Sequence, residues 1–356
     1  MTIGILIGTR PEIIKMSPIL RLAQERNLEF TLIHTGQHYS FEMDRIFFKQ
    51  LKLPAPKYHF DTKNMPYHKQ LTKIIDKTTK CIKKENLKVL LVQGDTNSVL
   101  GGAIATKRTN IKLGHIEAGL RSYDLRMPEE HNRFITDHLS DFLFAPTKES
   151  AKILEKEKIE KKKIFLTGNT VVDAVLQNSK LAKKTKEKKP YFLLTLHRTE
   201  NVDDKNTLSK IFDGLERIQT LNNSRIIFPI HPRTQKNIKK FGIKLPKNII
   251  TISPTGYLEF LSLLKDADLI LTDSGGIQEE SCVLKVPCIT LRINTERPET
   301  IKTGSNVVAG IEPEGIILAV KEMMARKRNW KNPFGQGDSA AKILDVIEKS
   351  LFNFQD

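Results

Sequence analysis

Short apolar runs alternate with helical patterns along the whole chain. The runs span residues 2–7, 29–34, 89–93, 111–116, 141–145, 164–167, 191–196, 225–230, 248–252, 268–272, 286–291 and 306–309. Nearly continuous apolar runs of this length are typical of strands that are buried on both faces of a parallel sheet. Because helical segments separate the runs, the pattern predicts an α/β fold in which helices cover both faces of parallel sheets.

A charged segment interrupts this pattern between residues 172 and 190, where Lys180–Pro190 has the sequence KLAKKTKEKKP. A chain of 356 residues is long enough for two domains that each bury a core of their own. We therefore predict two doubly wound, Rossmann-like domains with a cleft between them. Ligands of such sheets bind beyond the carboxyl ends of the strands. The last predicted helix, at 339–352, could pack on either domain.

The net charge of +17 raises nucleic acid as a binding partner. The lysines, however, occur in scattered clusters on polar helix faces, few aromatic residues accompany them, and no nucleic-acid-binding motif is present. A solvated surface rich in lysine and glutamate explains this composition better, so we predict no nucleic-acid partner. The positive field would still help to gather an anionic substrate.

Other sequence features indicate the cellular compartment and whether a metal is bound. No apolar run approaches the roughly 18 to 20 residues of a membrane span, and the opening segment is too short for a signal peptide. The three cysteines form no C-x-x-C pair, which is typical of a reducing compartment, and we expect a cytoplasmic protein with no membrane partner. The nine histidines form no close ligand set, so we expect no metal.

The segment at 268–280 combines a buried strand, a glycine turn and a helix start. Ser274, Gly275 and Gly276 follow the strand at 268–272 and begin the next helix. Unpaired amides and the helix dipole make such an end suitable for phosphate, and glycine allows a close approach. The alternative is an ordinary turn between a strand and a helix. Glu280, one turn into the helix, could accept hydrogen bonds from a ribose or belong to a solvated face.

Polar residues also follow the other predicted strands of the first half. Arg10 and Lys15 lie near the amino end of a helix, where the dipole gives no reason for cations, and they suit a diphosphate. The alternative is an exposed helix start. Because both residues follow the first strand, they would lie at the same sheet edge as the other strand ends.

Carboxylates form a second group at these strand ends. Asp95 follows the run at 89–93 and could also cap a helix, whereas Glu117 directly ends a buried strand, which is costly unless the charge is paired or functional. Glu129 lies in a nearby loop, and clustered carboxylates supply an acid and a base together. Glu130 and Arg133 could be a surface pair.

The second half repeats the arrangement. His197 follows the run at 191–196 and could neutralise a leaving phosphate or be an ordinary loop histidine, and His231 follows the next run. Thr255 and Phe260 could supply contacts and a ring for a base, although Phe260 could equally belong to the core. Arg297 could contact the same anion or the glutamate at 280.

With these motifs in order, the chain resembles the non-hydrolysing UDP-N-acetylglucosamine 2-epimerase family. The resemblance covers nearly the whole length. The matching motifs are G-T-R-P-E-x-I-K at Gly8–Lys15, G-D-T at Gly94–Thr96, G-H-x-E-A-G-L-R at Gly114–Arg121, P-E-E-x-N-R at Pro128–Arg133, T-G-N-T at Thr167–Thr170, L-T-D-S-G-G-x-Q-E-E at Leu271–Glu280, T-E-R-P-E at Thr295–Glu299 and N-P-F-G-x-G at Asn332–Gly337. Each motif alone is weak, but eight in order are highly specific.

This resemblance implies a glycosyltransferase-B-like fold whose last helix returns to the first domain. The first domain then comprises residues 1–171 and 339–356 and carries the catalytic carboxylates, and the second, residues 172–338, binds UDP. The implied reaction interconverts UDP-N-acetylglucosamine and UDP-N-acetylmannosamine for cell-surface polysaccharide or glycan precursors. UDP leaves, with loss of the proton on carbon 2, to give 2-acetamidoglucal, and then adds back. The resemblance implies a homodimer and no cofactor.

The matched motifs also imply roles for individual residues in the reaction. Asp95, Glu117 and Glu129 resemble the acid/base set, and His197 would assist the leaving diphosphate. Lys15 would act near the phosphates. Which carboxylate removes the proton and which returns it stays open.

Further matched residues would hold the substrate. Arg10, Ser274, Gly275 and Gly276 would bind phosphate, and Glu280 would bind ribose. Thr255 and Phe260 would line the uracil pocket, and Arg297 would orient Glu280 or the substrate. Gln37, His38 and His231 match part of the site that the resemblance implies for a second UDP-N-acetylglucosamine in bacterial relatives, so allosteric activation is a hypothesis.

Other functions remain open at this point. A hydrolysing 2-epimerase would release free N-acetylmannosamine, and an epimerase of a UDP-2,3-diacetamido-sugar would share the same motifs. A UDP-sugar glycosyltransferase would use the same nucleotide pocket, and a non-catalytic sensor would bind UDP without exchange at carbon 2.

Overall fold

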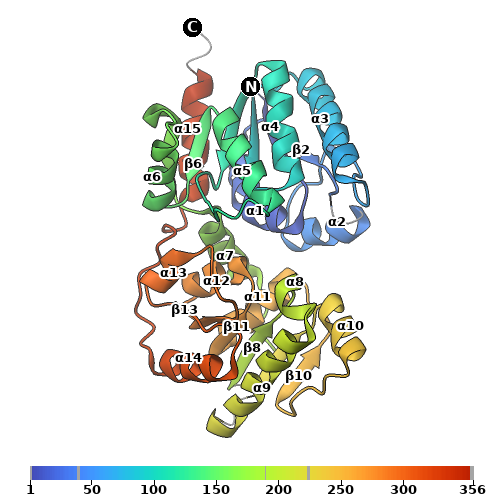
Figure 1. Ribbon diagram of the computed structural model, residues 1–356. Coiled ribbons are helices and arrows are strands. Elements are labelled where there is room, and N and C mark those ends of the chain that lie inside the picture. Colours follow the sequence, from blue (N-terminus) through green and yellow to red (C-terminus); the bar gives the residue numbers. More distant parts are fainter. Residues whose placement is uncertain (1, 38–40, 189, 223–224, 353–356) are drawn as a thin grey trace. The chain divides into compact units, whose positions relative to one another are not determined.

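The computed structural model describes residues 2–37, 41–188, 190–222 and 225–352. The chain divides into two compact units. Unit 1 comprises Met1–Gln177 and Phe334–Asp356, and unit 2 comprises Asn178–Pro333. In each unit, helices surround a twisted sheet (Figure 1).

The sheet of unit 1 has seven parallel strands in the order β3-β2-β1-β4-β5-β6-β7. The strands are β1 (Ile3–Ile7), β2 (Phe30–His34), β3 (Tyr58–His59), β4 (Val89–Gln93), β5 (Lys112–Ile116), β6 (Phe142–Ala145) and β7 (Ile164–Leu166). The helices are α1 (Arg10–Glu25), α2 (Phe41–Gln50), α3 (Tyr67–Lys84), α4 (Asn97–Thr109), α5 (Pro128–Leu139), α6 (Lys148–Lys156), α7 (Thr170–Leu181) and α15 (Ser339–Phe352), with a short 3₁₀ helix at Lys161–Lys163. Helix α7 contains the boundary between the units.

The sheet of unit 2 has six parallel strands in the order β10-β9-β8-β11-β12-β13. The strands are β8 (Tyr191–Thr195), β9 (Arg225–Pro229), β10 (Ile249–Ile252), β11 (Leu269–Thr272), β12 (Cys288–Thr290) and β13 (Asn306–Val308). The helices are α8 (Thr199–Val202), α9 (Lys205–Asn222), α10 (Pro232–Phe241), α11 (Tyr257–Asp266), α12 (Gly275–Val283), α13 (Pro298–Lys302) and α14 (Pro313–Ala325). Two doubly wound, Rossmann-like sheets confirm the predicted fold class.

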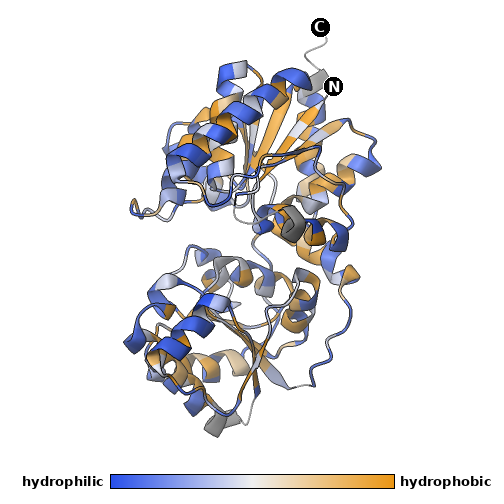
Figure 2. Ribbon diagram, turned by 90° about the vertical axis from the view of Figure 1, so that its right-hand side faces the viewer, coloured by the Kyte–Doolittle hydropathy of each residue, from blue (hydrophilic) through white to orange (hydrophobic). Residues whose placement is uncertain are grey.

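The central strands are buried along their whole length, as their continuous apolar runs predict. Every residue of β1, β4, β8 and β11 is buried. Hydrophobic residues gather on the strands, while hydrophilic residues colour the outer surfaces of the helices (Figure 2). The strand that the sequence pattern does not predict is β3, because two residues at a sheet edge form no apolar run.

The strand orders place a topological switch point in each sheet. The chain winds outward from β1 in one direction and from β4 in the other, and β8 and β11 form the equivalent pair in unit 2. In open α/β sheets, ligands bind at such points, beyond the carboxyl ends of the strands. The loops that follow these four strands therefore mark the expected position of a site in each unit.

The last helix, α15, packs in unit 1 although it follows the whole of unit 2 in the sequence. Arg26 at the end of α1 contacts two carboxylates of α15, Asp345 at 2.8 Å and Glu348 at 2.5 Å. At the other end of α15, the amides of Ser339 and Ala340 donate to Asp173 of α7 at 3.3 and 3.0 Å. These contacts attach the final helix to both α1 and α7. None of the helices in the described ranges is long and apolar enough to cross a membrane.

Candidate active site

Glu117 directly follows β5 at the carboxyl edge of the sheet of unit 1. Its backbone φ is 71°, a left-handed conformation that is uncommon outside glycine and tends to occur at functional sites. The amides of Glu117 and Ala118 both donate to the carbonyl oxygen of Phe144 in β6, each at 3.1 Å. The neighbouring strand thus fixes this turn, so the Glu117 side chain starts from a rigid position.

Side chains from three other segments donate to the buried Glu117 carboxylate. Lys15 Nζ of α1 lies 2.8 Å from Oε1 and 3.0 Å from Oε2. Gln93 Nε2, at the end of β4, donates to Oε2, and Asn169 Nδ2 lies 3.4 Å from Oε1. A buried carboxylate is costly unless a countercharge compensates it, and Lys15 supplies that charge. The sequence placed Lys15 near the phosphates, whereas the structure places its ammonium on Glu117.

Asp95 lies in the loop after β4 and is joined to Glu117 through Arg133. Arg133 of α5 donates from Nη2 to Asp95 Oδ2 and from Nη1 to the carbonyl oxygen of Glu117, the latter at 2.8 Å. Asn132 Nδ2 donates to the carbonyl oxygen of Asp95 at 2.9 Å. The interpretation of Glu130 and Arg133 as a surface pair is wrong, because both residues are buried and Arg133 points to the sheet edge.

Glu129, the third predicted carboxylate, is not part of this cluster. It is exposed in the first turn of α5. Within the part of the chain that the structure describes, it makes no hydrogen bond to Asp95 or Glu117. The structure therefore brings two of the three predicted acid/base residues together.

Glu12 connects the loop after β1 to the loop after β4. Only 2% of this residue is exposed, and its carboxyl accepts hydrogen bonds from the amides of Gly8 and Thr9 and from the Thr96 hydroxyl, which lies 2.5 Å away. Burial raises the pKa of Glu12 from its ordinary 4.5 to about 7; these hydrogen bonds act in the opposite direction, and nearby Asp95 adds to the rise. In the sequence, Glu12 stood out only as part of the motif at Gly8–Lys15.

The remaining predicted residues of unit 1 lie around the same switch point. Arg10 begins α1, and its guanidinium stacks over the Phe47 ring, 4.8 Å from the centroid. Gln37 accepts hydrogen bonds at Oε1 from the amide and the hydroxyl of Ser98, at 3.1 and 2.8 Å. His38, the next residue of the hypothetical activator site, lies outside the described residues.

In unit 2, a pocket of about 190 Å³ lies at the carboxyl ends of β8 and β9. Its lining contains four of the predicted site residues, His197, His231, Thr255 and Phe260. The other lining residues are Thr195, Leu196, Pro229, Pro254 and Ile277. The structure thus brings together the residues predicted to contact a nucleobase and the histidine predicted to neutralise a leaving phosphate.

Asp273 fixes the loop that carries His197. It follows β11, is fully buried, and accepts hydrogen bonds from the amides of His197 at 3.0 Å and Arg198 at 2.9 Å. Its Oδ1 lies 3.2 Å from Nδ1 of the His197 ring. Burial alone would raise the pKa of Asp273, but the interactions with His197 and the loop amides hold it below its usual range. Burial, with the charges of His197 and Arg233, lowers the pKa of His231.

The amino end of α12 is open, as a phosphate site requires. A Cβ added at Gly276 would meet no atom within 4 Å, and one added at Gly275 would meet Glu296 Oε2 at 3.5 Å. Ser274 is the N-cap residue, but its side chain makes no capping hydrogen bond. The first amides of this helix are therefore accessible to an anion.

Glu280 is buried within α12, as a specific contact with ribose would need, rather than lying on a solvated face. Arg297, predicted to orient it or the substrate, donates from Nε to Oε1 of the neighbouring Glu279 at 2.7 Å. Glu279 is almost fully buried, so this ion pair attaches the segment before α13 to α12. The motif contains both glutamates, and the sequence alone does not indicate which one Arg297 contacts.

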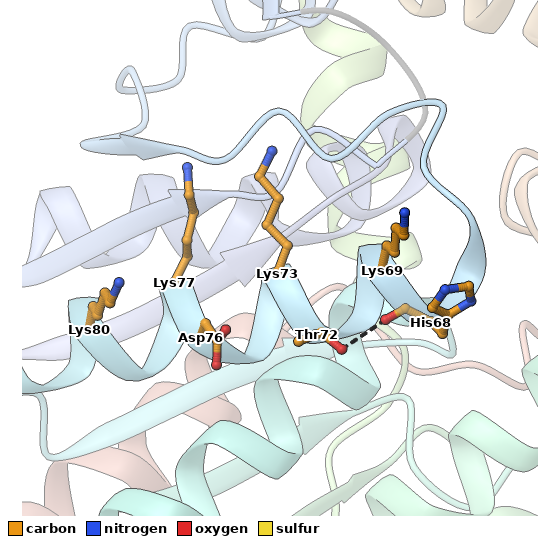
Figure 3. Close-up of a pocket in the computed structure, with 7 residues that line it drawn as sticks. All are labelled: His68, Lys69, Thr72, Lys73, Asp76, Lys77 and Lys80. Carbon is orange, nitrogen blue, oxygen red and sulfur yellow. Dashed lines mark hydrogen bonds between the residues drawn. The ribbon is translucent and has the colours of Figure 1, made fainter.

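A second pocket, of about 410 Å³, lies on α3 in unit 1 and is unrelated to the predicted residues. Lys69, Lys73, Lys77 and Lys80 project from one side of this helix, and the remaining lining residues are His68, Thr72 and Asp76 (Figure 3). We name these four lysines the α3 lysine face. Its composition is that of the solvated, lysine-rich surface predicted from the sequence, and the described residues hold no group of acidic, histidine or cysteine side chains suited to a metal.

Sequence reasoning missed several residues that the structure places at the two switch points. Glu12 and Asp273 lie inside recognisable motifs, G-T-R-P-E and L-T-D-S-G-G, which is the signal that could have identified them. Gln93 carries no such signal. Its importance follows only from the parallel register, in which it lies opposite Ile116, the residue before Glu117.

The two sets of residues can perform complementary chemistry. In unit 1, two carboxylates and two cations are held together at the edge of the sheet, a combination that can remove and return a proton. In unit 2, an open helix end and a histidine beside an apolar pocket can bind a nucleoside diphosphate.

Comparisons with known proteins agree with this chemistry. The family model described as UDP-N-acetylglucosamine 2-epimerase matches residues 20–348. The chain is 50% identical to the UDP-N-acetylglucosamine 2-epimerase of Methanocaldococcus jannaschii, over 98% of this chain and 99% of that protein. It is 51% identical to the enzyme of the same name from Methanococcus maripaludis, over 97% and 98%.

The fold leads to the same family. A crystal structure of the M. jannaschii UDP-GlcNAc 2-epimerase, in complex with UDP-GlcNAc and UDP, superposes with a TM-score of 0.89. The match has 50% identity and covers 98% of this chain and 100% of that one. The chain therefore belongs to the UDP-N-acetylglucosamine 2-epimerase family.

Proposed function

We propose that the chain is a non-hydrolysing epimerase that interconverts UDP-N-acetylglucosamine and UDP-N-acetylmannosamine. UDP leaves carbon 1 while carbon 2 loses its proton, and 2-acetamidoglucal and UDP then recombine with a proton delivered to the opposite face. The observation that carries the proposal is the pairing of Lys15 with the buried Glu117 and of the buried Arg133 with the partly exposed Asp95, near the β1/β4 switch point. The similar M. jannaschii enzyme, crystallised with UDP-GlcNAc and UDP, supports the substrate.

In this proposal unit 1 handles the proton. Carbon 2 is not adjacent to a carbonyl carbon, so its proton is weakly acidic, and a rigid base close to a cation is needed. Glu117 and Asp95 are the proposed proton-transfer groups, because each carboxylate lies against a cation, Lys15 and Arg133 respectively. A part for Glu129, which is exposed on α5, in the proton transfer stays a prediction.

Unit 2 holds the nucleotide. Ser274, Gly275 and Gly276 offer the amides at the start of α12 to the diphosphate. Glu280 accepts the ribose hydroxyls, and Thr255 and Phe260 line the pocket for uracil. His197 also lines that pocket and donates to the leaving diphosphate. Homodimeric assembly and activation by a second UDP-N-acetylglucosamine stay predictions.

Proton NMR of the purified protein with UDP-N-acetylglucosamine in deuterium oxide tests the reaction. We expect deuterium at carbon 2 and UDP-N-acetylmannosamine as the product, without added cofactor or metal. Free N-acetylmannosamine would identify the hydrolysing reaction instead. Intact substrate without exchange would contradict the proposal and direct attention to a UDP-2,3-diacetamido-sugar or to a transferase acceptor.

The same assay tests the assigned carboxylates. Glu117→Gln should lower the rate of deuterium exchange by about 100-fold or more, because it removes a proton-transfer group. Glu312→Gln, which alters an exposed carboxylate of unit 2, is the matched control and should exchange at the wild-type rate. An active Glu117→Gln variant would assign the proton transfer to other residues.

A further inference from the structure

Asp273 lies at the β8/β11 switch point and has no solvent-accessible surface, so a substrate cannot reach it. The register pairs Thr195 of β8 with Thr272 of β11, and Asp273 therefore lies directly beside the loop that leaves β8. A buried carboxylate is strongly unfavourable unless donors surround it. The donors that surround the Asp273 carboxylate show which segment of the chain it fixes.

The donors to Asp273 come from one short segment, residues 197–201. They are the amides of His197 and Arg198, the Nδ2 of Asn201 at 3.3 Å, and Nδ1 of the His197 ring at 3.2 Å. Asn201 also donates to the carbonyl oxygen of Leu291 at 2.8 Å, which attaches the segment to the residue that directly follows β12. The Asp273 carboxylate therefore fixes the conformation of the loop and the orientation of the His197 ring.

The His197 ring has two differently placed nitrogens. Nδ1 faces the buried carboxylate, whereas the side chain as a whole is 41% exposed and lines the pocket of about 190 Å³. A carboxylate at Nδ1 accepts a hydrogen bond from that nitrogen and so fixes the orientation and the tautomer of the ring. Nε2 is then the nitrogen that can donate to a ligand in the pocket.

We propose that Asp273 is a positioning residue that acts through His197 on the leaving diphosphate. This inference rests on the proposed function. When the bond between carbon 1 and the phosphate oxygen breaks, its electron pair stays on that oxygen, and the proton of carbon 2 passes to a base of unit 1. His197 donates a hydrogen bond from Nε2 to the oxygen, and Asp273 keeps its negative charge throughout.

A double-mutant cycle tests this role. Asp273→Asn keeps the size of the side chain and an oxygen for the loop amides, but its amide group faces Nδ1. We expect kcat to fall by about 100-fold while the affinity for UDP changes by less than about threefold. In a His197→Ala background the same substitution should have almost no further effect, because the residue through which Asp273 acts is absent.

Two outcomes would overturn the proposal. Full additivity of the two substitutions would show that Asp273 supports the fold and not the histidine, and unchanged kcat in Asp273→Asn would remove the role altogether. Asp213→Asn, an exposed aspartate of α9 in the same unit, is the matched control and should leave both kcat and UDP affinity unchanged.

A measurement on the unmodified protein covers the case in which Asp273→Asn does not fold. Long-range ¹⁵N–¹H NMR of histidine-labelled protein, with His197 assigned through the His197→Ala variant, should find a proton on Nδ1 of His197 in the UDP complex. A neutral ring with its proton only on Nε2 would refute the pairing. Because this spectrum needs no turnover, it tests the inference separately from the epimerase reaction, which wild-type exchange at carbon 2 tests.

Discussion

Glu12 illustrates how a residue that looks like part of a helix cap can connect two functional loops. Its carboxyl binds the loop after β1 through two amides and the loop after β4 through Thr96, the neighbour of Asp95. The group is buried, and its hydrogen-bond partners among the described residues include no cation. The neutral acid is therefore favoured in the folded protein, and its pKa rises to about 7.

This raised pKa predicts a specific pH dependence of stability. The folded state binds the Glu12 proton more tightly than the unfolded state, whose pKa is the ordinary 4.5, so the stabilisation is complete at low pH and is lost as the pH rises through about 7. The shift corresponds to about 3 kcal/mol. Glu12→Gln is neutral at every pH and should gain stability relative to the wild type between about pH 5 and about pH 8.

Thermal unfolding midpoints of both proteins across this range provide the measurement, since the difference between them cancels all groups that titrate identically. A difference that does not change with pH would mean that Glu12 is ionised in the fold, and that its three hydrogen bonds outweigh its burial.

Most of the side-chain contacts that the sequence did not predict join residues that lie far apart in the chain. Lys15 binds a carboxylate 102 positions later, and Asp273 binds amides 75 and 76 positions earlier. Local pattern indicates that a strand end is polar, but it does not indicate which polar groups meet. Glu117 was predictable, because a carboxylate at the end of a buried strand requires a special explanation.

At the scale of elements, α12 is a helix that begins with residues unfavourable to helix formation. Glycine weakens a helix, yet both of the first two residues of α12 are glycines. The space around Gly276 is empty within 4 Å of an added Cβ. Packing inside the protein therefore does not require glycine at this position, and a ligand that approaches the backbone closely would.

This contrast gives a prediction for Gly276→Ala. The helix should be as stable as in the wild type or more stable by up to about 1 kcal/mol, because alanine is the better helix former and nothing obstructs its methyl group. The affinity for UDP should nevertheless fall at least about tenfold, since the methyl group stands where the diphosphate approaches the amides.

Calorimetric titration with UDP and an unfolding curve of the same variant measure both effects. Uridine, which lacks the phosphates, is the matched control ligand and should bind the variant and the wild type equally. Unchanged UDP affinity would show that the diphosphate does not bind at the start of α12.

The elements themselves were the most predictable level of the structure. The run expected at 268–272 became β11 (Leu269–Thr272), and the run at 89–93 became β4 with the same bounds. Continuous apolar strands between amphipathic helices have few alternative folds. The short β3 was not predictable, because its two residues join the sheet only as an edge and carry no periodic pattern.

At the scale of the whole molecule, the charge is large and unevenly matched by acidic groups. The chain carries 58 lysines and arginines against 41 acidic residues. This excess produces a positive field that attracts an anionic nucleotide sugar before any specific contact forms, and salt screens it.

The field predicts that kcat/KM decreases when salt rises from about 20 mM to about 300 mM, whereas kcat changes little, because steering affects the encounter and not the bound complex. Steady-state kinetics at several salt concentrations measure this. Replacing the four residues of the α3 lysine face with glutamine should weaken the salt dependence without changing kcat. If kcat/KM is independent of salt, the surface charge does not contribute to substrate capture.

The attachment of α15 to unit 1 has a consequence for the order in which the protein matures on the ribosome. Unit 2 is one uninterrupted stretch of chain, so it can fold as soon as it leaves the exit tunnel. Unit 1 emerges first, but Arg26 and Asp173 gain their partners on α15 only after the whole of unit 2 has been synthesised. The unit that carries the carboxylates therefore emerges first but gains helix α15 only after unit 2 has been synthesised.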